Sequence, residues 1–493
     1  MKIYQNYVGG KWAASSSGKT FEDRNPARWE EIIGTFPRST PQDVDRAVSA
    51  AKEAFESWRL VPAPRRGDIV RKAGDIMSAR KEDIAREMTR EMGKVVEEAR
   101  GDVQEGIDTA YYAASEGRRL FGVIAPSELS NKFNMAVRVP VGICGLITPW
   151  NFPMAIPTWK IFPALVSGNT VIFKPAEDTP ATATTLVEIL IEAGVPEGVL
   201  NLVHGFGIEA GAALVEHAGV DLISFTGSTE VGRKIAEACG RTGKRVALEM
   251  GGKNAQIVME DADLELALEG ILWGAFGTTG QRCTATSRLI VHEGVYNKFI
   301  SMVVEKSKTL RIGDGLDENS DVGPLINEQQ LQTVQKYVEI GRQEGAKVLL
   351  GGVRDDSGEC RKGYFFKPTI LSDVIPGMRV EKEEIFGPVL AIIKVRSLDE
   401  AIQVANDTQY GLSSSIYTKD INKAFQAIRD LRAGITYVNA PTIGAEAHMP
   451  FGGVKGTGNG HREGGWTVFD IFTEWKAVYV DYSGKLQRAQ IDL

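Results

Sequence analysis

The sequence predicts an α/β protein made of two doubly wound, Rossmann-like domains and a small β element for oligomerisation. Three observations predict this class. The chain has 493 residues, more than one hydrophobic core usually supports. Hydrophobic residues make up 43% and charged residues 25% of it, as in ordinary globular proteins. From residue 139 onward, short β-branched segments alternate with helical segments, as a parallel sheet requires.

Composition and cysteine usage exclude several classes of protein. The net charge is −7 and the Lys and Arg residues are scattered, which argues against nucleic acid as a partner. No apolar run approaches the roughly 20 residues of a membrane-spanning helix, and the N-terminus lacks the apolar region of an export signal. The cysteines are too few and too widely spaced for a disulfide framework or a CxxC metal site: Cys144, Cys239, Cys283 and Cys360. We therefore expect a cytoplasmic protein with no metal and no membrane partner.

The first domain is expected to comprise residues 1–121 and 141–250. Apolar residues recur at helical spacing over 41–58 and 64–92, with a proline near each start, which predicts a helical N-terminal layer. Four β-branched segments then alternate with helices, one of them over 181–193. The four predicted strands lie in VGICGLITP, NTVIFKP, GVLNLVHG and LISFTGS.

The second domain is expected over residues 251–450. The segment NAQIVM, a helix over 264–276, the segment SRLIVH and a helix over 296–310 repeat the alternation of strand and helix. Two further segments, KFNMAVRVPVG and WKAVYVDY, have strand patterns that leave edges in need of a partner. We assign residues 122–140 and 468–493 to an oligomerisation element, which predicts a homodimer or homotetramer.

Cys283 is a candidate nucleophile. It lies in GTTGQRCTATSR, after two glycines and beside Arg282, where a loop leads into a predicted strand. A nearby cation and backbone N–H groups favour the thiolate, which is the nucleophilic form of cysteine. A buried structural cysteine is the common alternative, and the other three cysteines are interpreted that way.

Two further polar residues could serve the same chemistry. Glu249, in ALEMGGKNA, ends an apolar strand, and burial there would raise the pKa of its carboxyl toward that of a general base. It could equally be a solvated loop glutamate. Asn151, in ITPWNFP, could form an oxyanion hole through its side-chain N–H together with a backbone N–H, or simply belong to a turn.

Two segments have phosphate-binding patterns. The run HGFGIEAG matches G-x-G-x-x-A with Gly205 and Gly207, a weak signal because glycine-rich strand-to-helix turns are common. The run FTGSTEVGRK places Gly227 and Ser228 at another such turn, where free N–H groups favour a pyrophosphate. It lacks the Lys-Ser or Lys-Thr pair of a nucleoside triphosphate loop, so a dinucleotide is favoured.

Seven motifs resemble the aldehyde dehydrogenase superfamily, in the same order and over essentially the whole chain. They are ITPWNFP, FKPAEDTP, FTGSTEVG, LEMGGKNA, GQRCTA, EEIFGPV and PFGGVKGTG. The resemblance implies that the enzyme oxidises a small-molecule aldehyde to a carboxylate with NAD or NADP and water. It implies Cys283 as the nucleophile that carries a thioester, Glu249 as the general base, and Asn151 with the Cys283 backbone N–H as the oxyanion hole. The first domain would bind the dinucleotide, and the second would be the catalytic domain.

The resemblance also implies a set of cofactor-binding residues. Lys174 and Glu177 would hold the adenosine ribose, and Glu384 and Phe386 the nicotinamide ribose and ring. Gly205 is set aside. The remaining expected contacts are Thr148, Trp150, Gly207, Gly227 and Ser228. Glu177 would repel a 2′-phosphate, which favours NAD, although Lys174 leaves NADP open.

The motifs around Cys283 and PTIGAEAHMPFGGVKGTGNGHREGG resemble the branch that oxidises α-ketoglutaric semialdehyde (2,5-dioxopentanoate). Other semialdehydes, such as succinic or aminoadipic, and broad aliphatic specificity remain alternatives. Arg282 could bind a substrate carboxylate, or serve structure if it points away from Cys283. Three other classes are weighed: a thiol hydrolase, a CoA-acylating dehydrogenase, which the presence of Glu249 disfavours, and a non-catalytic relative.

Overall fold

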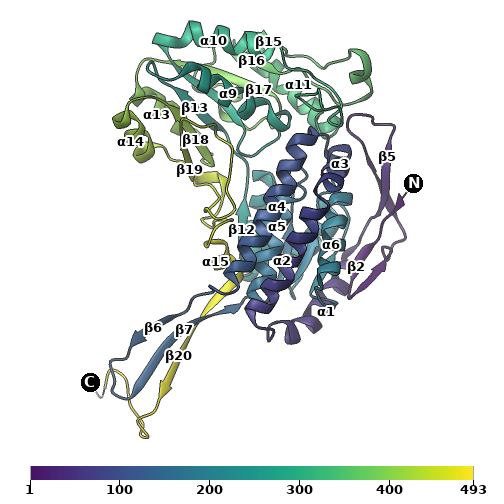
Figure 1. Ribbon diagram of the computed structural model, residues 1–493, viewed down its shortest axis with the longest axis vertical. Helices are drawn as coiled ribbons and strands as arrows, with labels where there is room; N and C mark the ends of the chain where they lie inside the picture. The colour runs from purple at the N-terminus through teal and green to yellow at the C-terminus, as the bar shows by residue number, and fades with distance from the viewer. Residues whose placement is uncertain (1, 492–493) are drawn as a thin grey trace.

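The computed structural model describes residues 2–491, so residues 492–493 of the predicted oligomerisation element lie outside the described residues. Figure 1 shows a helical and sheet region at the centre, a second α/β region above it, and a long arm of three strands projecting from the lower end. The predicted doubly wound α/β class is confirmed, because each of the two large sheets has helices on both faces. Among residues 2–491, no helix is both long and apolar enough to cross a membrane.

The N-terminal region begins with short strands that the sequence analysis did not predict. A three-stranded sheet has the order β1-β5-β4, while β2 and β3 extend the first large sheet. Three of them, β1, β2 and β3, have only two or three residues and are too short to display alternation. Their bounds are β1 (Lys2–Ile3), β2 (Asn6–Val8), β3 (Lys11–Ala13), β4 (Thr20–Arg24) and β5 (Ile32–Pro37).

The predicted helical layer is present, with one correction. The helix expected over 41–58 is confirmed as α1, but the single helix expected over 64–92 is wrong. The chain leaves helical geometry at Arg80 (φ −109°, ψ 14°). The Arg80 N–H donates to the carbonyls of Ile76 and Met77 at the end of one helix, and the Arg80 carbonyl accepts from the Ile84 N–H at the start of the next. Arginine is a good helix former, so nothing in the sequence marks the break. The layer comprises α1 (Pro41–Trp58), α2 (Ala63–Ala79), α3 (Lys81–Met92) and α4 (Val96–Glu116).

The first large sheet has the order β12-β11-β8-β9-β10-β2-β3. The five strands β8 to β12 are parallel to one another. Its register aligns Ile147 with Lys174 and with Phe225, and Thr226 with Glu249, so these strands end at one level. The strand order reverses between β8 and β11, the position where α/β sheets bind ligands. The elements are β8 (Ile143–Ile147), α5 (Ala155–Ser167), β9 (Thr170–Lys174), α6 (Pro180–Ala193), β10 (Leu200–Leu202), η1 (Gly207–Gly211), α7 (Ala212–Glu216), β11 (Leu222–Thr226), α8 (Thr229–Thr242) and β12 (Arg245–Glu249).

The second large sheet has the order β15-β16-β17-β14-β13-β18-β19, and all but β15 are parallel. The helix expected over 264–276 is confirmed, but the one expected over 296–310 begins earlier, because the His292 ring accepts a hydrogen bond from the Gly294 N–H (3.2 Å) and caps it. The elements are β13 (Asn254–Val258), α9 (Leu264–Phe276), η2 (Gly277–Gly280), β14 (Thr286–His292), α10 (Glu293–Ser307), α11 (Glu328–Gln343), β15 (Lys347–Leu350), η3 (Gly358–Lys362), β16 (Thr369–Ser372), α12 (Arg379–Lys382), β17 (Val389–Val395), α13 (Leu398–Asn406), β18 (Ser413–Tyr417), α14 (Ile421–Asp430), β19 (Ile435–Val438) and η4 (Lys455–Thr457).

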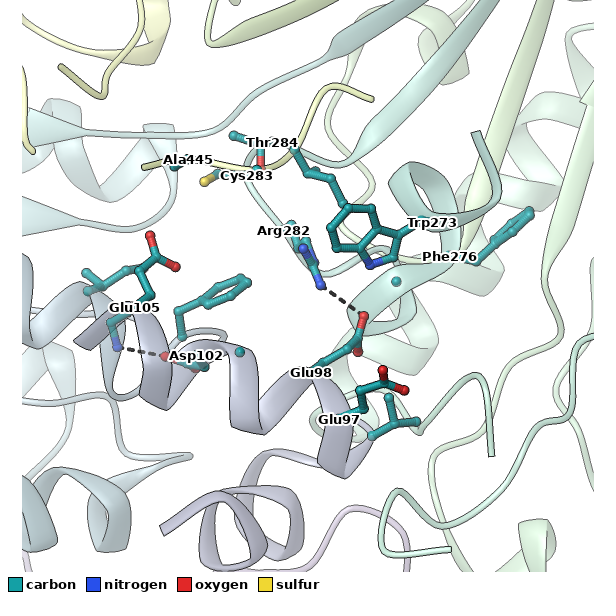
Figure 2. Close-up of a pocket in the computed structure, with 18 of the residues that line it drawn as sticks. Glu97, Glu98, Asp102, Glu105, Trp273, Phe276, Arg282, Cys283, Thr284 and Ala445 are labelled. Atoms are coloured by element: carbon teal, nitrogen blue, oxygen red, sulfur yellow. Dashed lines mark hydrogen bonds and ion pairs between the residues drawn. The ribbon is translucent and has the colours of Figure 1, made fainter. Parts of the chain in front are cut away.

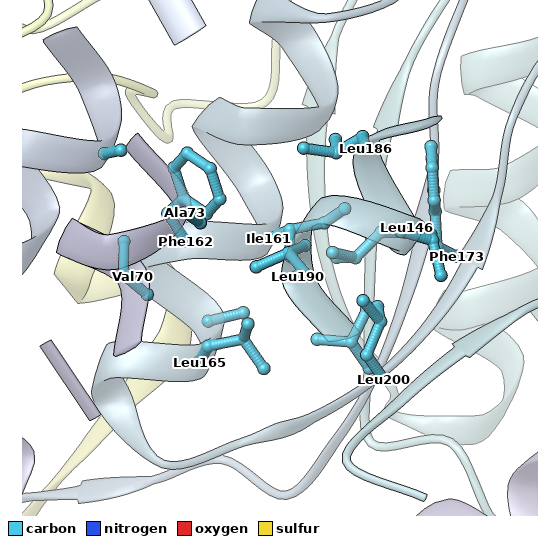
Figure 3. Close-up of a cluster of buried hydrophobic side chains, with 14 of the residues drawn as sticks. Val70, Ala73, Leu146, Ile161, Phe162, Leu165, Phe173, Leu186, Leu190 and Leu200 are labelled. Atoms are coloured by element: carbon cyan, nitrogen blue, oxygen red, sulfur yellow. The ribbon is translucent and has the colours of Figure 1, made fainter. Parts of the chain in front are cut away.

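The largest core fills the space between the first sheet and the helical layer. Figure 3 shows side chains of β8, α5, α6 and α2 meeting there, among them Leu146, Phe162 and Leu190. The short helix α15 (Val468–Phe472) belongs to this core, so the C-terminal strand of the arm begins at Thr473. The arm contains β6 (Val123–Pro126), β7 (Lys132–Pro140) and β20 (Thr473–Asp481), in the order β20-β7-β6.

Candidate active site

A cavity of about 750 Å³ lies where the two α/β regions meet. The carboxyl ends of β11 and β12 contribute Thr226 and Glu249, and the loop before β14 contributes Cys283. Helices α4 and α9 form the remaining walls, and Figure 2 shows acidic side chains of α4 facing the cysteine across the space. The cavity therefore combines the carboxyl edge of one sheet with the amino edge of the other.

The connection from β12 to β13 brings Glu249 and Cys283 to the same cavity. The chain leaves the first sheet after Glu249 and passes through Gly251 and Gly252 before β13 begins. A Cβ atom on Gly252 would lie 2.4 Å from the Cys283 carbonyl oxygen, so only glycine lets this crossing approach the cysteine loop. The glycines that follow Glu249 are thus required by close packing of backbone.

The cysteine loop is held from several directions. The Asn254 side chain donates hydrogen bonds to the carbonyls of Cys283 (2.8 Å) and Ala285 (2.9 Å). Before the cysteine, Thr278 and Thr279 have positive φ values of 52° and 57°, which are strained for β-branched residues. The surrounding contacts therefore impose a defined conformation on the segment that presents the thiol.

Asn151 lies beside this loop, as expected for an oxyanion hole. Its Nδ2 donates to the Gln281 carbonyl (3.0 Å), and the residue is 2% exposed. An amide nitrogen has two hydrogens, so one remains for another acceptor. The loop after β8 thus holds the Asn151 amide against Gln281, which precedes Cys283 by two residues in the chain.

The expectation that Arg282 favours the Cys283 thiolate is wrong. Arg282 bonds Glu98 through Nη2 (2.9 Å) and the Thr278 hydroxyl through Nε (2.9 Å), so a carboxylate neutralises its charge. Burial, together with the charges of Glu384 and Glu249, raises the pKa of Cys283 to about 12, although backbone N–H groups of Thr284 and Cys283 act in the opposite direction. The thiol is therefore protonated at neutral pH, and its proton must be removed for attack.

Glu249 is buried at the end of β12 and accepts no hydrogen bond of normal geometry at either carboxylate oxygen. Burial raises the pKa of this carboxyl well above its usual value, and Glu463 raises it further, while Lys160 and Arg462 act in the opposite direction. The direction agrees with the expectation for a general base. An unpartnered buried carboxylate facing a cavity is positioned to accept a proton from something in that cavity.

The crevice above the carboxyl edge of the first sheet brings together most of the expected cofactor residues. The Lys174 ammonium pairs with the Glu177 carboxylate (3.0 Å), and the Thr148 N–H donates to the Lys174 carbonyl (3.3 Å). The Trp150 and Phe386 rings meet edge to face at 5.4 Å. Residues from both α/β regions therefore border the same crevice.

Two observations test whether this crevice suits a dinucleotide. The Thr226 hydroxyl at the end of β11 is buried without a hydrogen-bond partner, next to the Ser228 cap of α8, which accepts from the Val231 N–H (3.3 Å). Glu384 accepts from the Gly252 N–H (2.8 Å), and burial raises its pKa to about 7. An orphaned hydroxyl, a helix N-terminus and a buried carboxyl are donors and acceptors that fit a pyrophosphate and a ribose.

The glycines of the two phosphate patterns differ. A Cβ atom on Gly227 would lie 2.5 Å from the Phe225 ring, so this turn needs glycine. Gly207 is exposed and begins the five-residue π-helical turn η1, and it is Gly211 at the end of this turn that lies near Lys174. The contact of Gly207 with adenine stays a prediction. The G-x-G-x-x-A match was considered a weak signal, and the irregular turn found there agrees with that interpretation.

Several residues of the cavity were missed by the sequence analysis. On the Glu249 side, the buried Glu463 pairs with the buried Lys160, which also donates to the Ser224 hydroxyl (2.9 Å). On the opposite side lie three acids of α4: Glu98, Asp102 and Glu105. Charged residues on a helix are usually solvated, so their pattern gave no signal. Among residues 2–491, no three His, Cys, Asp or Glu side chains are grouped so as to hold a metal ion.

Comparisons with known proteins agree with this geometry. Residues 12–478 match the model of the aldehyde dehydrogenase family. The chain is 45% identical over 477 residues to the α-ketoglutaric semialdehyde dehydrogenase of Bacillus subtilis, covering 97% of this chain and 98% of the relative. It is 41% identical over 485 residues to the D-glyceraldehyde dehydrogenase (NADP(+)) of Picrophilus torridus, covering 98% and 97%.

A solved structure has the same fold. The betaine aldehyde dehydrogenase of Staphylococcus aureus in complex with NAD+ aligns with a TM-score of 0.95 at 34% identity, covering 98% of this chain and 95% of that chain. The family match extends over nearly the whole chain and includes every motif on which the resemblance was based. This chain belongs to the aldehyde dehydrogenase family, and its activity is the oxidation of an aldehyde.

Proposed function

We propose that this enzyme oxidises an aldehyde to a carboxylate with NAD or NADP and water, through a thioester on Cys283. The observation that carries this proposal is the convergence of Cys283 and Glu249 on one cavity, with the Asn151 amide fixed beside the cysteine loop. A thiol, an unpartnered carboxylate and an amide donor are the groups that acyl chemistry on an aldehyde requires.

The first half of the reaction begins at the thiol. Its sulfur attacks the aldehyde carbon, the thiol proton passes to the Glu249 carboxylate, and the aldehyde oxygen becomes an oxyanion. The free N–H of Asn151 and the Cys283 backbone N–H donate to that oxygen. Loss of hydride from the same carbon then converts the thiohemiacetal into a thioester.

The second half is hydrolysis. Glu249 first releases the thiol proton to solvent. A water molecule then attacks the thioester carbon and gives a proton to Glu249. The carbon–sulfur bond breaks, the Cys283 sulfur takes that proton back, and the product acid loses its own proton to leave as a carboxylate. The raised pKa of Glu249 makes it a stronger base than an exposed glutamate. Nothing in this cycle needs a CoA thiol, since the same carboxylate serves both steps.

The dinucleotide supplies one function when bound, acceptance of the hydride by its nicotinamide ring. Lys174 and Glu177 would hold the adenosine ribose, Glu384 and Phe386 the nicotinamide end, with Thr148, Trp150, Gly207, Gly227 and Ser228 along the crevice. The Lys174 charge is already paired with Glu177, whose side chain is 33% exposed, so Lys174 is not a free cation for a 2′-phosphate. This supports NAD as the preferred cofactor.

We propose a short semialdehyde as the substrate, with α-ketoglutaric semialdehyde as the leading candidate because the Bacillus subtilis relative carries that name. Steady-state oxidation of a panel of aldehydes with each cofactor, followed by absorbance of the reduced nicotinamide, tests the proposal. The expected result is reduction of NAD in preference to NADP, fastest with an aldehyde that bears a carboxylate. Absence of any reduction with every aldehyde, or turnover only after CoA is added, would overturn it.

We also propose a first domain of residues 1–121 and 141–250 and a second domain of residues 251–450.

We propose the arm as an oligomerisation element. The strands of the arm expose Ile124 (71%), Trp475 (51%) and Tyr479 (66%), and β19 leaves an unpaired edge at the far side of the second sheet. An exposed sheet edge and an exposed apolar strand favour pairing between copies of the chain. Sedimentation of the full chain, with residues 473–491 deleted as the comparison, distinguishes a dimer or tetramer from a monomer.

A cytoplasmic location is proposed on the state of the cysteines. All four are free, and an enzyme that uses one as a nucleophile needs a reducing compartment. Fractionation of cells that express the chain at natural levels tests this directly, and enrichment with an exported marker would contradict it.

A further inference from the structure

Glu105 is a half-buried acid that the proposed reaction does not use. It lies in the middle of α4 and lines the same cavity as Cys283, and Figure 2 shows its carboxyl group pointing across that space toward the cysteine. Within residues 2–491, it makes no ion pair and its side chain makes no hydrogen bond. An acid of this kind lacks a structural explanation within the fold.

Most other carboxylates of the cavity are paired with a cation or exposed to solvent, which sets Glu105 apart. Glu98 pairs with Arg282 (2.9 Å), and Asp102 pairs with the fully buried Lys94 (2.9 Å). Glu463 pairs with Lys160, and Asp321 with Arg311. Glu97 and Glu269 are unpaired but exposed to solvent. Among residues 2–491, the cavity carboxylates that form no ion pair and are not fully exposed are Glu249, which is buried, and Glu105, which is half-buried.

We propose that Glu105 and the Arg282 guanidinium together bind the carboxylate end of a short oxo-acid substrate while its aldehyde carbon lies at Cys283. Arg282 lines the cavity, and its Nη1 has no partner among residues 2–491, so it can donate to a substrate oxygen while Nη2 stays bonded to Glu98. This inference rests on the proposed function, because it assigns the substrate class of that site.

Glu105 must hold a proton to donate to a carboxylate, and its surroundings favour the protonated form. Burial raises the pKa of Glu105 to about 8, so it is mostly neutral at pH 7. Asp102 and Asp108 on its own helix raise the pKa, while Lys94 and Arg282 lower it. Tyr437 of β19 and Cys283 are the other titratable groups on the facing elements, and Glu105 in turn raises the pKa of Tyr437. A hydrogen bond to a charged acceptor is the stronger kind.

A cationic aldehyde is the competing occupant, since the lining is rich in acids and aromatic rings. Of the aromatic rings that line the cavity, Phe152 and Trp273 already face cations of the protein itself. Lys94 lies 3.9 Å from the centre of the Phe152 ring, and Arg282 lies 5.4 Å from Phe152 and 5.7 Å from Trp273. A cationic substrate would therefore be repelled by Arg282, and a neutral Glu105 would not offset that repulsion. The observations favour an anion.

The first test compares two aldehydes of equal length, succinic semialdehyde and butanal, by the ratio of their kcat/KM values. Glu105→Ala is expected to lower this ratio about tenfold or more, because a charge-assisted hydrogen bond is lost only with the anionic aldehyde. Glu105→Gln keeps a donor and should retain most of the ratio. The matched control, Glu269→Gln, alters an exposed acid of the same cavity and should leave the ratio unchanged. An unchanged ratio in Glu105→Ala would overturn the proposal.

The pH dependence separates binding from a structural role. In the wild type, the ratio should fall as pH rises through about 8, because Glu105 then becomes an anion that repels the substrate carboxylate. Glu105→Gln should show a flat ratio over the same range. Effects of pH on Cys283 or Glu249 apply to both aldehydes and cancel in the ratio. A fall that persists in Glu105→Gln, or a loss confined to 4-aminobutanal in Glu105→Ala, would favour the cationic occupant and refute the inference.

Binding of glutarate, followed by calorimetry, distinguishes this inference from the proposed function. Glutarate has carboxylates but no aldehyde, so its binding needs no turnover. The expected result is about tenfold weaker binding in Glu105→Ala than in the wild type. If no aldehyde is oxidised but glutarate binding depends on Glu105, the proposed function fails and the anion site remains. If aldehydes are oxidised but glutarate binds Glu105→Ala as tightly as it binds the wild type, the anion site is refuted and the proposed function remains.

Discussion

Glu249 on the sheet wall of the cavity and the acids Glu98 and Asp102 on the α4 wall are held in opposite ways. On the sheet wall, Glu249 ends β12 with no hydrogen-bond partner at either oxygen. On the α4 wall, Glu98 and Asp102 are each paired with a cation, and Glu98 also accepts from the Thr278 N–H (2.8 Å). An unpaired buried carboxylate is costly to the fold, whereas paired ones can hold a loop in place. The sheet wall is therefore expected to carry the chemistry, and the α4 wall to position it.

The strongest test of this division is Cys283→Ala. Removing the sulfur eliminates the atom that forms the thioester, so aldehyde oxidation should be lost entirely while the folded structure remains. Reduction of the nicotinamide and the thermal midpoint report the two effects separately. Cys144→Ala, in the first core, is the matched control and should change the thermal midpoint but leave oxidation in place. Oxidation that survives in Cys283→Ala would contradict the assignment.

Glu249→Gln should give the next largest effect. The amide cannot accept a proton, so removal of the thiol proton and thioester hydrolysis should both slow, with turnover falling by roughly 10²- to 10⁴-fold. Because the substitution also removes an uncompensated buried carboxyl, stability should be maintained or rise slightly. Rapid-quench measurements that find accumulated acyl-enzyme would locate the defect in hydrolysis. A steady-state rate equal to that of the wild type would exclude Glu249 as the base.

Asn151→Ala removes the side-chain N–H group that is proposed to donate to the oxyanion. Loss of one oxyanion donor commonly costs about 2.7 to 4 kcal/mol of transition-state stabilisation, so kcat should fall roughly a hundredfold or more. The variant also loses the hydrogen bond to the Gln281 carbonyl, which adds a stability cost on the order of 1 kcal/mol. Single-turnover kinetics separate the two effects. A loss of stability with unchanged kcat would restrict Asn151 to a structural role.

The sequence predicted the sheet wall well because its residues follow strands. Glu249, Lys174 and Thr148 each lie at or just after a β-branched segment, and parallel strands bring such ends to one edge. The register confirms this alignment, since Ile147 pairs with Lys174 and Thr226 with Glu249. Local patterns are sufficient when the periodicity of one strand determines where its end lies.

The α4 wall could not be predicted from the sequence. Glu98 meets Arg282 across 184 residues of chain, so only tertiary packing brings them together. Helical periodicity shows that α4 is amphipathic but not which element its acids face. The same lack of long-range information explains why Arg282 was first interpreted as a cation that ionises Cys283. Its partner Glu98 lies outside every motif that resembles the family.

Glu98→Gln tests whether the α4 wall positions the cysteine loop. The substitution leaves Arg282 without its counter-charge in a largely buried site, where their side chains are 10% and 12% exposed. Stability should fall by about 1 to 3 kcal/mol, the cost of an unsatisfied charged group. Denaturant unfolding measures this loss, and Glu97→Gln, an exposed neighbour, should show almost none. A fall in kcat without loss of stability would instead place Glu98 on the chemical side of the cavity.

The last prediction concerns the pH dependence of stability on the α4 wall. The pKa of Glu105 is about 8 in the folded protein, whereas a glutamate in the unfolded chain titrates near about 4.3. The folded state thus binds this proton more tightly, so the stability that Glu105 contributes is fully present below about pH 4 and is lost as pH rises through 8. Relative to Glu105→Gln, the wild-type free energy of unfolding should fall by up to about 1 kcal/mol per pH unit between these limits. Urea unfolding of both proteins at several pH values measures the difference. Because Glu91 and Asp178 also have raised pKa values, only this paired comparison isolates Glu105, and parallel curves would mean that its carboxyl is already ionised in the folded protein.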